Sequence, residues 1–319
     1  MLDSTLVPSV SIVVPTYREA DNLPILTRRL AATLRPLGWV WEVIIVDDNS
    51  PDATPAVLEQ LRKQYPEFNY RIRTNERGLS SAVLAGISLA RHDYVLVMDA
   101  DLSHPPESVP ELIKPLAQGQ ADYVIGSRYV DGGRTEDWGF LRWLNSYGAT
   151  LLSRPLIGAV RDPMAGFFAL RRNTLVQAAA LNPVGYKISL ELMVKCGTQR
   201  VHEVPIVFRN RLLGESKLTM GQQMQYLQHL ARLYQFRFPR LVRGAYWALG
   251  SLAGVTLATA CAGLLWLMGV ADVIVLSTGM ALVAGAVAVL WHRQPQPQTQ
   301  QTRLPLQPQT QPMRHAASA

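Results

Sequence analysis

The sequence predicts an α/β protein whose doubly wound, mostly parallel sheet is followed by membrane-associated helices. Three observations support this prediction. Short apolar runs rich in β-branched residues alternate with helical patterns over the first third of the chain, as in folds with right-handed crossovers. The apolar run 94–102 ends abruptly in two carboxylates, Asp99 and Asp101. Residues 244–290 carry one charged side chain, Asp272, and this run is about twice the ~20 residues that cross a bilayer.

The individual elements follow from apolar periodicity and from turn residues. Strands are expected at residues 9–15, 41–47, 70–73, 94–102, 123–127 and 201–208, and another follows the turn at 162–168. Two helices are expected to begin after Asn22 and after Thr54, and a third is expected to follow residues 77–80 and to end at Ala90. Further helices are expected at residues 107–118, 141–152 and 189–196.

Two of these helices and one loop allow more detailed predictions. Leu23, Leu26 and Leu30 should form the buried face of the first helix. Thr54 should cap the second helix, because Pro55 suits the first helical position. The glycine-rich polar residues 134–139 predict a mobile loop.

Asp99 and Asp101 predict a cation site at the carboxyl end of a central strand, where open α/β sheets bind ligands. Because they are two residues apart in an extended chain, their side chains point the same way, roughly 6–7 Å apart. Two such carboxylates hold a divalent cation, which in turn holds a diphosphate. The alternative is a pair of solvated acids in a turn, because Asp-x-Asp occurs by chance in many proteins.

Charge and cysteine content limit the partners of this chain of 319 residues, whose formal net charge is +7 and whose pI is about 9.6. A basic chain suits a membrane surface, phosphorylated ligands or nucleic acid, and nucleic acid ranks last because no aromatic-rich basic motif is present. Cys196 and Cys261 lie far apart, so neither a disulfide framework nor a zinc site is expected. With no basic segment before an apolar core at the N-terminus, we expect no signal peptide and a cytoplasmic α/β domain.

The composition divides the chain into four parts. Residues 1–218 should form the α/β domain, 219–243 an amphipathic membrane-interface helix, 244–293 two transmembrane helices and 294–319 a disordered tail rich in Gln and Pro.

The two membrane parts rest on different patterns. In the interface helix, apolar side chains recur at helical spacing beside a basic rim, and an ordinary core-packing helix is the alternative; these residues are Met224, Leu227, Leu230, Leu233 and Tyr234. The membrane hairpin should comprise residues 244–268 and 273–291. Basic residues flank both of its outer ends, which places both termini in the cytoplasm.

Six short motifs, each weak alone, occur together in a specific order. They are VPTYRE at 14–19, VDDNSPD at 46–52, DADLSHPPE at 99–107, GSRY at 126–129, DPMAGFF at 162–168 and GESKL at 214–218. In this order the chain resembles the family 2 glycosyltransferases with the GT-A fold, a doubly wound, Rossmann-like nucleotide-sugar domain. Within that family it looks most like the polyprenol-phosphate (dolichol-phosphate) mannosyltransferases, a branch to which the motif at 162–168 points.

The resemblance implies roles for particular residues. The nucleoside of GDP-mannose would be held by Pro15, Tyr17, Glu19, Val46 and Asp48. The donor diphosphate would be held by Asp99, Ala100 and Asp101 through Mg²⁺ or Mn²⁺, with Ser103 as a third metal ligand. The phosphates of donor and acceptor would be surrounded by Arg128, Arg211 and Lys217, and Asp99, Asp101 and Arg128 would be the catalytic residues. For any one of these basic residues the alternative is a solvated surface charge.

The same resemblance implies an inverting transfer of mannose from GDP-mannose to a polyprenyl (dolichyl-type) phosphate in the lipid bilayer. A phosphate monoester is already anionic at neutral pH, so no general base is assigned. Ser103 stands where the family usually has a metal-binding Gln, and Ala165 stands where it usually has Ser. A hydroxyl is a shorter and weaker ligand than an amide, so a water would complete the metal's coordination.

Three alternatives remain. A sister enzyme would use UDP-glucose, and a non-catalytic membrane subunit would bind nucleotide sugar without turnover. A Rossmann dehydrogenase is disfavoured because no Gly-x-Gly-x-x-Gly follows the first strand. The oligomeric state, including a homo-oligomer, stays open.

Overall fold

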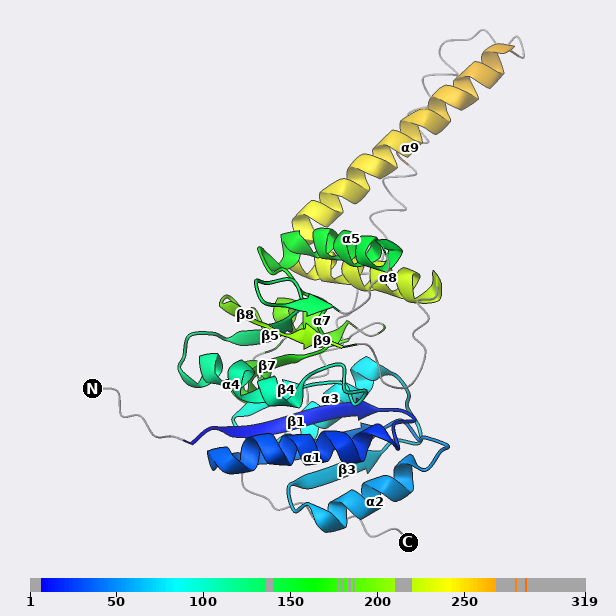
Figure 1. The fold of residues 1–319 in the computed structure, drawn as a ribbon. Coiled ribbons are helices and arrows are strands. Elements are labelled where there is room, and N and C mark those ends of the chain that lie inside the picture. Colours follow the sequence, from blue (N-terminus) through cyan, green and yellow to red (C-terminus); the bar gives the residue numbers. More distant parts are fainter. Residues whose placement is uncertain are drawn as a thin grey trace. The chain divides into compact units, whose positions relative to one another are not determined.

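A computed structural model describes residues 7–135, 140–176, 187–209 and 220–267, with a few isolated residues outside these ranges (Figure 1). Within them, seven strands form one sheet in the order β3-β2-β1-β4-β7-β5-β8. These strands are β1 (Ser9–Thr16), β2 (Val40–Asp47), β3 (Phe68–Ile72), β4 (Tyr94–Val97), β5 (Tyr123–Ser127), β7 (Phe168–Arg171) and β8 (Val201–Pro205). A second sheet pairs β6 (Arg134–Thr135) with β9 (Val207–Phe208).

Helices connect the strands and continue beyond the sheet. They are α1 (Asn22–Leu34), α2 (Thr54–Gln64), α3 (Leu79–Leu89), α4 (Val109–Ala117), α5 (Phe140–Ile157), α6 (Arg172–Val176), α7 (Ile188–Lys195), α8 (Met220–Arg237) and α9 (Pro239–Leu267). The predicted alternation of strand and helix is confirmed, with shifts: β3 begins earlier than expected, and the helix expected at 141–152 is longer. The strand expected at 94–102 ends at Val97, so the acid pair lies in a loop after β4 and not in the extended strand.

The large sheet is parallel except for one internal strand. β1 is parallel to β2 and β4, β2 is parallel to β3, and β5 is parallel to β8, whereas β7 is antiparallel to both β4 and β5. Because β7 runs in the opposite direction, its first residue, Phe168, pairs with Val97 at the end of β4. The turn at 162–167 therefore reaches the edge of the sheet where β4 ends, beside Asp99.

The prediction of one strand at 201–208 is wrong, because this stretch serves two sheets. β8 pairs with β5, and β9 pairs with β6. Ile206 lies at the crossing: its N–H donates to the carbonyl of Ser127, and its carbonyl accepts from the N–H of Arg134. Periodicity indicates an extended chain but not its partner. Part of the loop predicted at 134–139 is thus strand β6, and its remainder lies outside the described residues.

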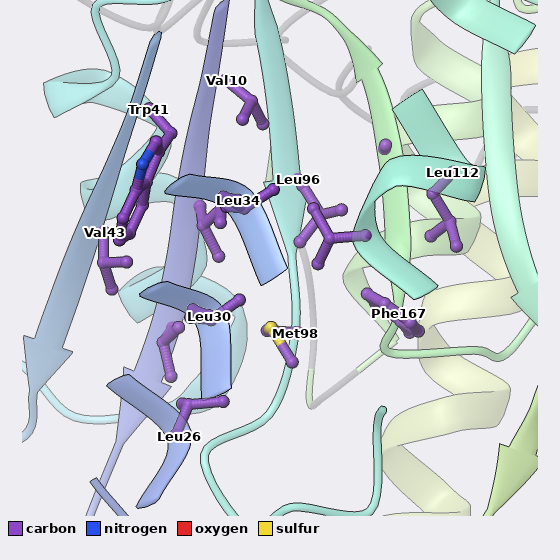
Figure 2. Close-up of a cluster of buried hydrophobic side chains, with 14 of the residues drawn as sticks. Val10, Leu26, Leu30, Leu34, Trp41, Val43, Leu96, Met98, Leu112 and Phe167 are labelled. Carbon is purple, nitrogen blue, oxygen red and sulfur yellow. The ribbon is translucent and has the colours of Figure 1, made fainter. Parts of the chain in front are cut away.

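The core forms where α1 and α4 pack against one face of the sheet (Figure 2). Leu23, Leu26 and Leu30 of α1 are fully buried, as predicted. They meet apolar side chains of the central strands, such as Leu96 of β4. α3 contacts β1 and β2. Because helices cover both faces, the strands are apolar on both sides, which explains their continuous apolar runs.

Gly86 of α3 lies where that helix approaches the sheet most closely. A Cβ atom at this position would lie 2.3 Å from Cγ1 of Val13 and 3.1 Å from Cγ2 of Val46. We therefore expect Gly86→Ala to lower the free energy of unfolding by about 1–3 kcal/mol through overpacking, although alanine is the better helix former. Thermal unfolding of the purified protein in detergent would measure the change.

Gly148 of α5 provides the matched control. A Cβ at Gly148 would meet nothing within 4 Å. Gly148→Ala should therefore raise the free energy of unfolding by about 0.5–1 kcal/mol. Equal effects of the two substitutions would contradict the packing explanation for Gly86.

α8 packs on the α/β domain through a buried polar pair. Nε2 of His229 lies 2.8 Å from Oε2 of Glu191 in α7, and both side chains are buried. Burial opposes ionisation of Glu191, but its hydrogen bonds with His229 and Lys195 outweigh this effect and lower its pKa. Leu230 is buried while Leu227 is half-exposed, so this helix packs on the core along part of its apolar stripe, and its placement at a membrane interface stays a prediction.

α9 is the one helix among the described residues that is long and apolar enough to cross a membrane. The candidate span is Pro239–Leu264, with a mean hydropathy of 1.5. It overlaps the first predicted transmembrane helix, 244–268. The second, 273–291, lies outside the described residues except at two positions, as does the tail 294–319. The chain divides into two compact units between Leu233 and Tyr234.

Candidate active site

A pocket of about 190 Å³ opens at the edge of the sheet where β1, β2 and β4 end. Seven of the predicted donor-binding residues line it together: Pro15, Tyr17, Glu19, Asp48, Asp99, Ala100 and Asp101. Their loops are distant in sequence but meet here because the three strands are parallel neighbours. Val46 is fully buried in the sheet, so its side chain lies beneath the pocket rather than in it.

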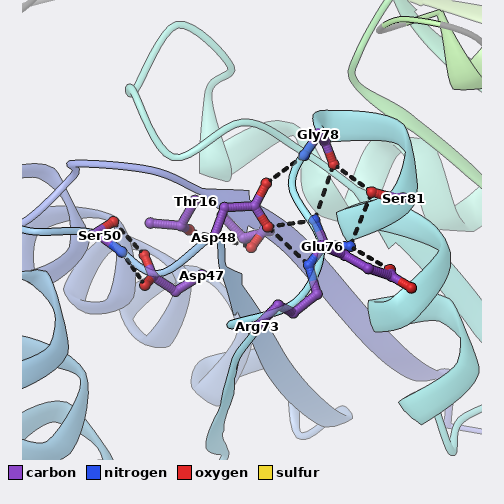
Figure 3. A network of polar contacts seen from close by, with 9 residues as sticks. Thr16, Asp47, Asp48, Ser50, Arg73, Glu76, Gly78 and Ser81 are labelled. Atoms are coloured by element: carbon purple, nitrogen blue, oxygen red, sulfur yellow. Dashed lines mark hydrogen bonds and ion pairs between the residues drawn. The ribbon is translucent and has the colours of Figure 1, made fainter.

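Asp48 is held at one side of the pocket by a network of polar contacts (Figure 3). Arg73 donates to Oδ1 of Asp48 from Nε at 2.8 Å and also from its second terminal nitrogen, and the N–H of Gly78 donates to Oδ2 at 2.7 Å. Arg73 itself is anchored by the carbonyl of Gly78 at 3.1 Å and by Ser81 at 2.9 Å. Both oxygens of Asp48 thus already accept hydrogen bonds, so a ligand would meet a fixed carboxylate.

Arg73 is a residue that sequence reasoning missed. It follows directly after β3, which neighbours β2, and it is buried together with Asp48. The available signal was its place at the end of a strand, at the same edge as Asp48. The ion pair itself could not be read from spacing, because the two residues come from different strands.

The loops after β1 and β2 are tied together by hydrogen bonds. The N–H of Arg18 donates to the Ser50 hydroxyl at 2.9 Å, and that of Glu19 donates to the Thr54 hydroxyl at 3.1 Å. Thr54 therefore does not cap α2 as predicted, because its hydroxyl serves Glu19. Asp52 accepts from the N–H of Thr54 instead, at 3.1 Å.

The backbone is strained at three points around this pocket. Among the described non-glycine residues, positive φ angles occur at Arg18, Asn49 and Leu102, with values of 60°, 56° and 62°. They fall in the loops after β1, β2 and β4 in turn. Such conformations are unfavourable for residues with a side chain and persist where the surroundings fix them, as they do at binding sites.

The acid pair lies on the loop that leaves β4. Asp101 is nearly buried, and its Oδ1 accepts from the N–H of Ser103 at 3.0 Å. The carboxylate of Asp99 is more open and faces Gly166, where an added Cβ would lie 3.4 Å from Oδ2. The turn at 162–167 thus leaves room for Asp99 by having no side chain there.

The donor set at this loop fits a hard divalent cation. Mg²⁺ and Mn²⁺ prefer oxygen ligands, and Asp99 and Asp101 supply carboxylate oxygens at the pocket wall. Ser103 is not among the residues that line the pocket: its side chain is fully buried, and its hydroxyl has no hydrogen-bond partner among the described residues. Clusters of three or more His, Cys, Asp or Glu are absent from the described residues, and the rest of the coordination would come from ligand and water.

Arg128 is fixed beside the acid pair by Asp162. Its Nε and one terminal nitrogen each donate to the Asp162 carboxylate at 2.7 Å, and its backbone N–H adds a bond at 3.0 Å. The guanidinium also lies 5.4 Å from the centre of the Phe208 ring. Burial opposes its charge, but Asp162 and more weakly Asp99 raise the pKa of Arg128, so it stays cationic close to Asp99.

Residues 11–177, which contain the whole pocket, match the family described as Glycosyl transferase family 2. The chain belongs to this family.

Several dolichol-phosphate mannosyltransferases are similar to this chain over most of their length. The dolichol-phosphate mannosyltransferase of Pyrococcus furiosus is 42% identical over 263 residues, which are 81% of this chain and 72% of that protein. The dolichol-phosphate mannosyltransferase of Saccharomyces cerevisiae is also 42% identical, over 72% of this chain and 88% of that protein.

Solved structures with the same fold are more distant in sequence. The mannosyl-3-phosphoglycerate synthase of Rubrobacter xylanophilus has a TM-score of 0.55 at 20% identity, covering 72% of this chain and 74% of that one. The glucosyl-3-phosphoglycerate synthase of Mycobacterium tuberculosis, in complex with Mn²⁺ and UDP, has a TM-score of 0.53 at 18% identity, covering 72% and 80%. The GT-A-like mixed α/β fold expected from the motifs is thereby confirmed.

Two predicted site residues of this family 2 chain, Arg211 and Lys217, lie outside the described residues.

Tyr17 has two basic neighbours that sequence reasoning did not assign. The guanidinium of Arg18 lies 5.2 Å and that of Arg77 lies 5.8 Å from the centre of its ring. Positive charge therefore gathers around an aromatic ring at the pocket wall.

Proposed function

We propose that the protein transfers mannose from GDP-mannose to a polyprenyl (dolichyl-type) phosphate, with inversion at the anomeric carbon, in a metal-dependent reaction. One observation carries the proposal. The predicted donor residues share a single pocket with Asp99 and Asp101, in a chain that is 42% identical to dolichol-phosphate mannosyltransferases.

Within the pocket, each group has a distinct task. Asp48, fixed by Arg73, would accept hydrogen bonds from the ribose or base through its remaining lone pairs. Asp99 and Asp101, with Ser103, would hold Mg²⁺ or Mn²⁺. When bound, this ion would neutralise the negative charge that develops on the departing diphosphate. Arg128, Arg211 and Lys217 would attract and orient the phosphates of donor and acceptor.

The chemistry requires no proton transfer from the acceptor. The second pKa of a phosphate monoester is near 6, so the acceptor arrives as an anion. One of its oxygens forms a bond to the anomeric carbon as the bond to the diphosphate breaks, and the product is β-mannosyl phosphate polyprenol. The residues contribute by aligning the two phosphates on opposite sides of that carbon and by holding positive charge beside the leaving group.

The membrane segments fit an acceptor whose hydrocarbon chain stays in the bilayer. α9 has the length and hydropathy of a membrane span. We place the α/β domain and both termini on the cytoplasmic side, following the basic residues that flank the predicted hairpin. Tethering the active site to the bilayer would keep it near its acceptor.

An assay of lipid extracts tests the proposal. Membranes containing the protein would be incubated with labelled GDP-mannose or UDP-glucose and extracted into organic solvent, with Asp101→Asn membranes as the control. We expect label in the extract from GDP-mannose alone. Label from UDP-glucose would favour the sister enzyme, and none from either would favour a non-catalytic nucleotide-sugar-binding subunit.

The proposed role of Ser103 leads to a separate prediction. Ser103→Ala should raise the metal concentration for half-maximal rate about tenfold, which is about 1.4 kcal/mol, the scale of one lost polar contact near a charge. The thermal stability of the metal-free protein should be unchanged or higher, because the hydroxyl is buried without a partner. Ser108→Ala, in the turn before α4, is the control. Identical Mg²⁺ and Mn²⁺ titrations for all three proteins would remove Ser103 from the ligand set.

A further inference from the structure

His104 lies in the loop of the acid pair but has no role in the function proposed above. Its side chain is buried, and its Nδ1 lies 3.0 Å from the backbone nitrogen of Asp99. A backbone N–H is always a donor, so Nδ1 of His104 must carry the lone pair. The ring therefore accepts a hydrogen bond from the residue that begins the proposed metal site.

This hydrogen bond takes over where the sheet stops. The N–H of Met98 still donates to the carbonyl of Val13 in β1, at 3.1 Å. The N–H of Asp99 faces the other side, where the pairing of β4 with β7 ends at Val97 and Phe168, and it is satisfied by His104. The bond closes the loop from Asp99 to His104 on itself. Leu102 within that loop has a φ of 62°, which a leucine adopts only where its surroundings fix it.

Two other segments hold the imidazole ring in place. The ring stacks on Phe167, with centroids 5.1 Å apart and an angle of 19° between the planes, and it meets the edge of Phe208 at 5.5 Å. At Gly166, an added Cβ would lie 3.3 Å from Cε1 of His104 and 3.4 Å from Oδ2 of Asp99. A side chain at position 166 would thus meet the imidazole and the carboxylate at once.

We propose that His104 is a positioning residue that sets the geometry of Asp99 and Asp101 for a divalent cation bound with the donor diphosphate. Phe167 and Gly166 support it, which gives a physical role to the Gly-Phe step of the turn before β7. The nature of the ligand rests on the proposed function; the dependence of cation binding on His104 does not.

Three variants separate the hydrogen bond from the packing. His104→Phe keeps an aromatic ring against Phe167 but removes the acceptor. His104→Asn removes the ring but keeps an acceptor oxygen close to the position of Nδ1. Gly166→Ala keeps His104 and presses on the ring and on the Asp99 carboxylate. His202→Phe is the control, because His202 is an exposed side chain on β8.

The measurement is Mn²⁺ binding to the purified full-length protein in detergent, followed by electron paramagnetic resonance with GDP present. We expect His104→Phe to raise the Kd for Mn²⁺ at least tenfold, His104→Asn to recover part of that loss, and Gly166→Ala to raise the Kd about three- to tenfold. GDP binding in EDTA, measured by calorimetry, should stay within about twofold of wild type in all variants, because the nucleoside side of the pocket is built from other loops.

The results have distinct meanings. Wild-type Mn²⁺ affinity in a folded His104→Phe protein would overturn the proposal, and so would a His104→Asn protein that binds no better than His104→Phe. If His104→Phe fails to fold, Gly166→Ala decides, because wild-type Mn²⁺ affinity in that protein would equally overturn the proposal. Mn²⁺ binding that requires UDP instead of GDP would refute the proposed donor, while the ratios between variants would still decide the role of His104. Failure of the wild type to bind Mn²⁺ with either nucleotide would refute both.

Discussion

Replacing Asp101 with Asn is expected to lower the rate of mannosyl transfer roughly 10²- to 10³-fold or more while leaving the fold intact. Asparagine keeps an oxygen that can accept the bond from the N–H of Ser103, so the loop should hold its shape. It removes a negative charge from the proposed cation site, and electrostatic groups aimed at a leaving group contribute on this scale. Initial rates at saturating GDP-mannose and Mg²⁺, in detergent, would measure the change.

Asp93, at the opposite end of β4, offers a matched control. It is an exposed acid that accepts a hydrogen bond from Ser9. Asp93→Asn should leave the rate within about a factor of two, as surface substitutions do. A wild-type rate from Asp101→Asn, or full activity of the wild type in excess EDTA, would refute the role assigned to the acid pair.

Asp162→Ala is expected to have the largest effect on stability. The carboxylate accepts three hydrogen bonds from Arg128, and both side chains are largely buried. Removing it would leave a buried guanidinium without its hydrogen-bonded counter-ion, which costs about 3–5 kcal/mol. For a domain of this size the midpoint of thermal unfolding should fall by roughly 6–20 °C.

A double variant distinguishes the lost ion pair from a general disturbance of the turn. Arg128→Met combined with Asp162→Ala removes both charges, so much of the lost stability should return, whereas activity should not, because Arg128 is proposed to face the phosphates. Asp131→Ala tests an exposed ion pair with Arg161 and should change the midpoint little. A double variant as unstable as Asp162→Ala alone would contradict the explanation.

Local sequence patterns located the acid pair because they mark where strands end, whereas the other lining residues were assigned through the resemblance to family 2 glycosyltransferases. Asp48 and Asp99 follow apolar runs, and parallel neighbouring strands bring such ends together without further information. The patterns do not show which residues from separate segments contact one another. Arg73 and His104 escaped notice because the contacts that define them, with Asp48 and with Phe167, join separate segments.

The errors in the elements have the same origin. Thr54 was a good cap by residue type, but its hydroxyl is used by the N–H of Glu19 from another loop. In α8, apolar spacing predicts one face, yet the structure buries Leu230 and leaves Leu227 half-exposed. A stripe of apolar residues does not reveal how much of it a neighbouring helix will cover.

The antiparallel strand inside the sheet has a consequence for biosynthesis. β1 precedes β4 in the chain and is already present to pair with it, but the other edge of β4 waits for β7, at Phe168–Arg171, which is synthesised much later. Until those residues leave the ribosome, a growing chain exposes the unpaired N–H and C=O groups of a fully apolar strand, which other chains can pair with. Truncated chains that end before Phe168 should therefore aggregate, and slower synthesis beyond β5 would prolong the exposure.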